Sequence, residues 1–209
     1  MAVTKKKAKW SATIDVALVV IRTGDSSTGT ETAIDTANQI QVEPQINEED
    51  AVQVIKDGKV LAQKLGKSTL TGNQITLTDN VFSPEVAKIL QGGQVSGEGA
   101  TLTYQPPAAG SGETGEVFEL DVYSAEYNAA GQIVKYEKIT YPNCQGTPIG
   151  LGTEDGVFRV PEYTINSAPD TGEAPYTLSY VTELPNFSEE LSLQSLSADA
   201  GTAGTPSVV

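Results

Sequence analysis

The sequence predicts a mainly β fold, a sandwich-like or barrel-like domain that carries one short flanking α-helix. Strand-favouring Val and Thr are abundant, and 20 Gly and 11 Pro supply many turns. Apolar and polar residues alternate over several short runs, while a helical period with start and stop signals is clear only at residues 84–91. With 209 residues, of which 38% are hydrophobic, the chain can bury one modest core.

The helix has the clearest local signals in the chain. Ser83 is a good N-cap, and Pro84 suits the first helical position, where its missing N–H costs nothing. Gly92 and Gly93 supply a left-handed stop. A helix of about two turns is unstable alone, so we expect it to pack on a sheet or on another subunit. Its apolar stripe consists of Val86, Ile89 and Leu90.

Strands are expected before and after this helix. Ile75 and Leu77 alternate with polar neighbours, as in a half-buried strand. Residues 14–21 are apolar at successive positions, so both faces of that strand should be buried. Asp57 and Gly58 separate two apolar runs and form a two-residue hairpin signal. The expected strands are 14–21, 40–42, 52–55, 60–65, 73–78, 101–104, 116–123, 133–141, 157–165 and 176–184, with loops at 24–36, 105–115 and 166–175.

The two ends of the chain differ from its middle. Residues 1–12 include four lysines, and we expect a mobile basic arm. Residues 13–189 form the β domain, and residues 190–209, rich in Ser, Ala, Gly and Thr, are expected to be a flexible tail. The apolar run after the arm is short and interrupted by Asp15, which predicts neither an export signal nor a membrane anchor.

Composition excludes several kinds of chemistry. The chain has no histidine and a single cysteine, Cys144, so one chain cannot build a Ser-His-Asp triad, a Cys-His pair or a histidine-ligated metal site. A net charge of −14 makes it a poor binder of nucleic acid phosphates. The glycines of residues 150–156 lack the spacing of a phosphate-binding loop. We therefore expect no enzyme activity, no cofactor and no metal.

One catalytic alternative stays open. Glu119 and Asp121 lie two positions apart on an expected strand and so share one face, where a carboxylate pair can hydrolyse glycosides. Acid pairs are common in acidic proteins. Sugar-binding sites ordinarily use aromatic side chains, and all aromatic residues together make up only 6% of this chain. The pair alone is a weak signal for a hydrolase.

A basic arm, a hairpin, a long loop, a short helix and a tail on one β core favour self-assembly, because each can complete a neighbour's sheet or groove. On the residues alone, ordinary loops explain these elements equally well. The candidate self-assembly residues are Lys5, Lys6, Lys7, Asp57, Gly58, Ser83, Pro84, Val86, Ile89 and Leu90.

Three segments resemble the major tail (tail tube) protein of long-tailed bacteriophages of the siphophage type. They are ITLTDNVFSPEVAKILQGG (75–93), YEKITYPNCQGTPIGLGTEDGVFRVPEYTINSAP (136–169) and YTLSYVTELP (176–185). The resemblance covers roughly residues 70–185 and carries no catalytic signature. It implies a β-sandwich with a flanking helix, assembled as hexameric rings that stack into a tube for the genome.

The same resemblance implies partners and a location. A tape measure protein, a tail terminator and a distal tail protein would meet the tube, in a virion assembled in the bacterial cytoplasm. DNA would pass through without specific binding, since an acidic wall repels phosphates. Without the arm, the body has 9 positive and 27 negative residues, a net charge of −18. Glu119 and Asp121 are the expected lumen-facing acids.

Two further functions remain as alternatives. Inner tubes of contractile tails and of phage-tail-like bacteriocins share the fold that the resemblance implies. A monomeric β-sandwich adhesin or binding module is the alternative from another class, and it predicts an export signal that the sequence does not show.

Overall fold

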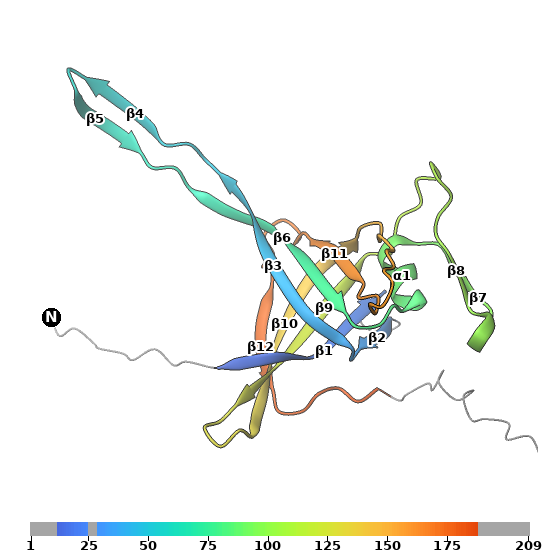
Figure 1. Ribbon diagram of the computed structural model, residues 1–209. Helices are drawn as coiled ribbons and strands as arrows, with labels where there is room; N and C mark the ends of the chain where they lie inside the picture. The colour runs from blue at the N-terminus through green and yellow to red at the C-terminus, as the bar shows by residue number, and fades with distance from the viewer. Residues whose placement is uncertain (1–11, 25–28, 188–209) are drawn as a thin grey trace, which may run out of the picture.

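The computed structural model describes residues 12–24 and 29–187 (Figure 1). Within them the chain is mainly β with one short α-helix, as the sequence predicts. The arm at 1–12 and the tail at 190–209 fall almost entirely outside the described residues. The elements are β1 (Thr13–Thr23), β2 (Thr30–Ile34), β3 (Ala37–Glu48), β4 (Val52–Lys56), β5 (Lys59–Lys64), β6 (Ser68–Asp79), α1 (Pro84–Gln91), β7 (Gln94–Ser96), a 3-10 turn (Gly99–Thr101), β8 (Thr103–Gln105), β9 (Phe118–Tyr127), β10 (Ile133–Gly146), β11 (Glu162–Ser167) and β12 (Thr177–Val181).

One antiparallel sheet forms the body of the subunit. Its strand order is β2-β1-β9-β10-β11-β6-β3, and β12 pairs with β10 on the same side as β11. The sheet curls until β3 lies close to β1, which gives a barrel-like form with an open seam between these two strands. Two smaller ribbons, β4-β5 and β7-β8, stand apart from the main sheet.

The core fills the concave side of this sheet. Alternate residues of β1, β9, β6 and β11 point inward, and α1 adds two apolar side chains from one end. Residues on the other side of β1 form a second, smaller cluster with Tyr123, against which Val181, Leu184 and Phe187 pack. Burial on both faces of β1 thus confirms the sequence prediction for its second half. The inward-facing residues that are almost completely buried include Val19, Ile21, Leu120, Ile75, Leu77, Tyr163, Ile165, Val86 and Leu90.

Helix α1 has the bounds and cap that the sequence predicts. Ser83 Oγ accepts a hydrogen bond from the Val86 N–H at 3.4 Å, and Gly92 ends the helix with a φ of 83°. Gly115 and Gly146 lie directly against Leu90, where a Cβ atom on Gly146 would come within 2.6 Å of the Leu90 Cβ. The sequence left open whether the helix packs on a sheet or on another subunit. In the structure it packs against the sheet of its own chain.

Several sequence predictions are wrong in detail. The expected strand at 101–104 begins as the 3-10 turn Gly99–Thr101 and becomes strand β8 only at Thr103. The expected loop at 24–36 contains strand β2. This strand lies at the edge of the sheet and is largely polar, so its sequence shows no apolar alternation. The expected strand at 40–42 is only part of β3, which continues outward over exposed residues. The expected strand at 157–165 begins only at Glu162, after Pro161, which has no N–H to donate to a strand ladder.

Candidate assembly surfaces

The β4-β5 hairpin projects far from the body of the subunit (Figure 1). Every residue from 41 to 69 is exposed, so the whole ribbon and its stem stand in solvent. Asp57 and Gly58 connect the strands with φ values of 52° and 73°, the conformation of a type I′ turn. The sequence prediction of a hairpin at these two residues is confirmed.

Both faces of this hairpin carry large apolar side chains. Val52 and Val54 lie on one face, while Ile55 pairs with Val60 on the other. Two-stranded ribbons are marginally stable in water, and contiguous apolar patches mark interaction sites. The hairpin therefore lacks a covering surface on each side. Its exposed apolar residues are Val52, Val54, Ile55, Val60, Leu61 and, at its base, Leu65.

The hairpin is also basic, in contrast to the chain as a whole. Lys56 and Lys59 face each other at the tip, where like charges repel. Lys64 pairs with Glu49 at 2.5 Å, but both side chains are exposed, so this ion pair contributes little. Residues 52–64 hold three lysines and one aspartate, a net charge of +2 in a chain whose total is −14.

A second exposed surface is the loop at 150–160, between β10 and β11. Both ends are anchored: the Ile149 N–H donates to Gln91 Oε1 at 2.7 Å, and the Pro161 carbonyl accepts from the Asp79 N–H at 3.0 Å. Every residue between the two ends is exposed, and Phe158 retains 92% of its accessible surface. The loop tip is apolar and acidic, with Leu151, Val157 and Phe158 beside Glu154 and Asp155.

The two acids predicted to face a lumen do share one face of β9, but the subunit pairs both of them. Asp121 is only 1% exposed, and its carboxylate contacts Lys138 at 2.7 Å, Arg22 at 3.1 Å and the Thr140 hydroxyl at 2.5 Å. Glu119 is more exposed and pairs with Arg22 as well. Asp121 is therefore not the free surface carboxylate that its strand position suggests. That Glu119 and Asp121 face the lumen of a tube stays a prediction.

Both cations of this cluster respond to the carboxylates. Hydrogen bonding to Glu31 is the largest influence on Arg22 and raises its pKa, with Asp121 and Glu119 adding to the effect. Burial by itself lowers the pKa of Lys138, but the hydrogen bond and charge of Asp121 outweigh burial and raise it. The cluster thus holds opposite charges together, as a structural ion-pair network does.

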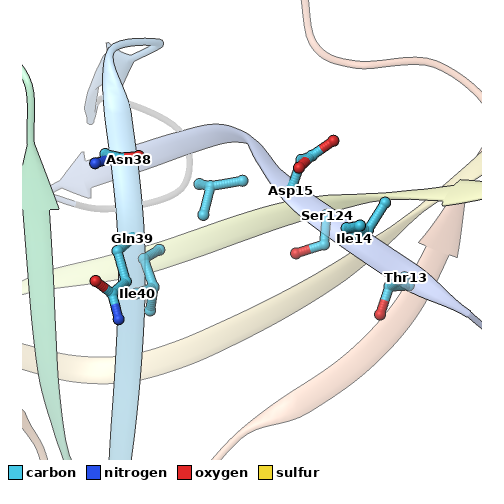
Figure 2. A pocket seen from close by; sticks show the side chains of 8 residues that line it. Thr13, Ile14, Asp15, Asn38, Gln39, Ile40 and Ser124 are labelled. Carbon is cyan, nitrogen blue, oxygen red and sulfur yellow. The ribbon is translucent and has the colours of Figure 1, made fainter.

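One hollow lies at the seam between β1 and β3 (Figure 2). It measures about 390 Å³, and its only carboxylate belongs to Asp15, a non-glycine residue with a φ of 64°. In the described part of the chain no cluster of three or more His, Cys, Asp or Glu residues could hold a metal ion. No described helix is long and apolar enough to cross a membrane. The hollow is lined by Thr13, Ile14, Asp15, Val16, Asn38, Gln39, Ile40 and Ser124.

The predicted self-assembly residues fall into four groups. Asp57 and Gly58 occupy the exposed hairpin tip. Val86 and Leu90 are buried in the subunit's own core, so their side chains cannot contact a neighbour directly. Lys5, Lys6 and Lys7 lie outside the described residues. The remaining three, Ser83, Pro84 and Ile89, are half-buried around α1.

Sequence reasoning missed the apolar residues of the hairpin and of the 150–160 loop. A signal was present in the hairpin: Val54 and Ile55 are adjacent apolar residues, so both faces of that strand are apolar. Such a run is ordinarily buried inside a sheet, and only the structure shows that it is exposed.

No family model matches the sequence, and no curated protein matches it. Several chains of solved structures match, and three of them are the following. The anti-feeding prophage cap, which terminates that particle's tube, has 14% identity over 86% of this chain and 99% of its own, with a TM-score of 0.37. A chain of the anti-feeding prophage baseplate has 10% identity, 85% and 93% coverage and a TM-score of 0.32. A chain of the sheath–tube complex of the extracellular contractile injection system PVC has 15% identity, 80% and 92% coverage and a TM-score of 0.36. At these TM-scores the likeness carries no argument about function.

Proposed function

We propose that this protein is a structural subunit that assembles with copies of itself through its projecting hairpin. The observation that carries the proposal is the β4-β5 ribbon, which is apolar on both faces and exposed along its whole length. Burying one Val, Leu or Ile side chain contributes about 1.5–3 kcal/mol, so covering several of them favours association strongly.

Charge supports a second copy as the partner. The hairpin is basic, whereas the remainder of the protein is strongly acidic, so the surface of another copy attracts it. Open strand edges add further sites for association. Among the described residues β2 pairs only with β1, and β3 only with β6, so each offers backbone groups to a neighbour.

The sequence resemblance supplies the form of the assembly: stacked, hexameric rings that make the tail tube of a virion and conduct the genome. Within that proposal, a tube subunit of a non-contractile tail and an inner tube subunit of a contractile tail or phage-tail-like bacteriocin are both possible. The similar solved structures come from an anti-feeding prophage and a contractile injection system, but their TM-scores are too low to choose between the two.

A purely structural role is part of the proposal. Asp121 and Glu119, the carboxylate pair weighed above for glycoside hydrolysis, are held in ion pairs: Asp121 with Arg22 and Lys138, and Glu119 with Arg22. A tape measure protein, a tail terminator and a distal tail protein are the further partners that the resemblance implies.

The test is to compare the full chain with a variant in which residues 51–65 are replaced by a short Asn-Gly turn. Electron microscopy and sedimentation of concentrated protein should show rings or tubes for the full chain and a folded monomer for the variant. The matched control shortens the other exposed ribbon, at residues 97–102, and should still assemble. A full chain that remains strictly monomeric at millimolar concentration would overturn the proposal and favour the binding-module alternative.

A further inference from the structure

We propose that the hairpin of one copy docks on the 150–160 loop of a neighbouring copy. This inference rests on the proposed self-assembly and names the two surfaces that meet. Each surface is built by the fold and left uncovered in the single subunit.

The two surfaces are chemically complementary. The hairpin combines exposed aliphatic side chains with Lys56 and Lys59, which flank Asp57 and Gly58 at its tip. The loop combines exposed apolar side chains with Glu154 and Asp155, while its one cation, Arg159, lies over the Phe82 ring. Phe158, almost fully exposed at the end of the loop, is the kind of aromatic anchor that dominates protein interfaces. Opposite charges at the rim and apolar side chains at the centre are the arrangement of a specific interface.

The two surfaces cannot meet within one subunit. The hairpin joins β6 at the first residue of that strand, Ser68. The loop is hydrogen-bonded to the last residue of β6, Asp79. A strand of this length separates them by about 35–40 Å, at a rise of about 3.3 Å per residue. Figure 1 shows the hairpin projecting from the end of β6 opposite to the end where α1 begins.

This placement allows contacts that propagate from copy to copy. A contact between two different surfaces at opposite ends of one subunit is heterologous, so each copy offers both a hairpin and a loop to successive neighbours. Unless two copies pair reciprocally about a two-fold axis, such contacts close into a ring or continue as a stack. The inference thus predicts a polymer whose growth depends on both surfaces equally.

Charge reversal tests the pairing. The hairpin variant carries Lys56→Glu and Lys59→Glu, and the loop variant carries Glu154→Lys and Asp155→Lys. Each should raise the concentration needed for assembly at least tenfold, because like charges then face each other. A 1:1 mixture of the two should assemble again, since every hairpin meets a loop of opposite charge. A chain with all four substitutions should also recover.

The control reverses another exposed acidic pair with Asp170→Lys and Glu173→Lys. This control raises the net charge by the same amount as the loop variant does. It should neither impair assembly nor rescue the hairpin variant. Phe158→Ser, at an almost fully exposed site that leaves the fold intact, should weaken assembly about tenfold. If the full chain polymerises but the loop variant does so equally well, or if the mixture fails to recover, the pairing is wrong while self-assembly stands. A full chain that never polymerises defeats the proposed function itself.

Discussion

The Asp121 carboxylate lies 2.7 Å from the Lys138 ammonium nitrogen, across the pair of strands β9 and β10, with only 1% of the aspartate exposed. Arg22 reaches the same carboxylate from β1, so three neighbouring strands are joined at one point on the outer side of the sheet. A buried charge without partners is very costly, which is why this residue depends on both cations.

Asp121→Asn should lower the free energy of unfolding by about 2 kcal/mol. The substitution keeps the shape and an acceptor for Thr140, but it leaves Lys138 without its ion-pair partner in a partly buried position. Glu119→Gln is the matched control, and it should cost less than about 1 kcal/mol because that carboxylate is partly exposed. Urea unfolding followed by circular dichroism measures both, and equal losses would contradict the network described above.

The protein should lose stability as the pH rises from about 9 to 12. Burial raises the pKa of Tyr141, Tyr163 and Cys144 to about 12, from ordinary values of 10, 10 and 9. In that range the native state holds protons that the unfolded state has released, so raising the pH favours unfolding. Urea midpoints at pH 7, 9 and 11 measure the effect, and a flat profile would contradict it.

Tyr163→Phe isolates one of these groups. The Tyr163 hydroxyl is buried and makes no hydrogen bond within the described residues, so its removal should leave stability at pH 7 unchanged or raise it by about 1 kcal/mol. The variant should also lose less stability between pH 10 and 12. Tyr180→Phe, at an exposed hydroxyl that donates to Glu137, is the control and should change neither quantity. A large loss at pH 7 would contradict the prediction.

Cys144 should resist alkylation in the native protein. Its thiol is fully buried in the core, and the raised pKa keeps it protonated, whereas the thiolate is the reactive form. Iodoacetamide at pH 8 should label the native chain at least a hundredfold more slowly than the chain in urea. Rapid labelling in native buffer would mean that the strand around Cys144 opens readily.

Local signals explain what the sequence alone predicts well. The helix bounds, the Ser83 cap and the Asp57-Gly58 turn each depend on a few adjacent residues, and all three appear as predicted. The barrel-like sheet follows from repeated alternation, as at Ile75 and Leu77. These features need no knowledge of which strand lies beside which.

Contacts between distant strands explain what the sequence does not give. The burial of Asp121 depends on Arg22 and Lys138, which only the strand pairing brings together. Strand β2 has no apolar alternation of its own and exists because β1 offers it an edge. Val54 and Phe158 are exposed because they lie beyond the main sheet. The sequence around each residue does not show where that sheet ends.

Gly146→Ala should destabilise the subunit by about 2 kcal/mol. A methyl group at this position would lie 2.6 Å from the Leu90 Cβ and 2.5 Å from the Leu90 carbonyl oxygen, so α1 must move away from the core. Overpacking of this kind typically costs about 1–3 kcal/mol. Gly150→Ala is the matched control, since a Cβ there meets nothing within 4 Å, and it should be neutral. Urea unfolding separates the two outcomes, and equal stability of both variants would show that the helix is not held against β10 as described.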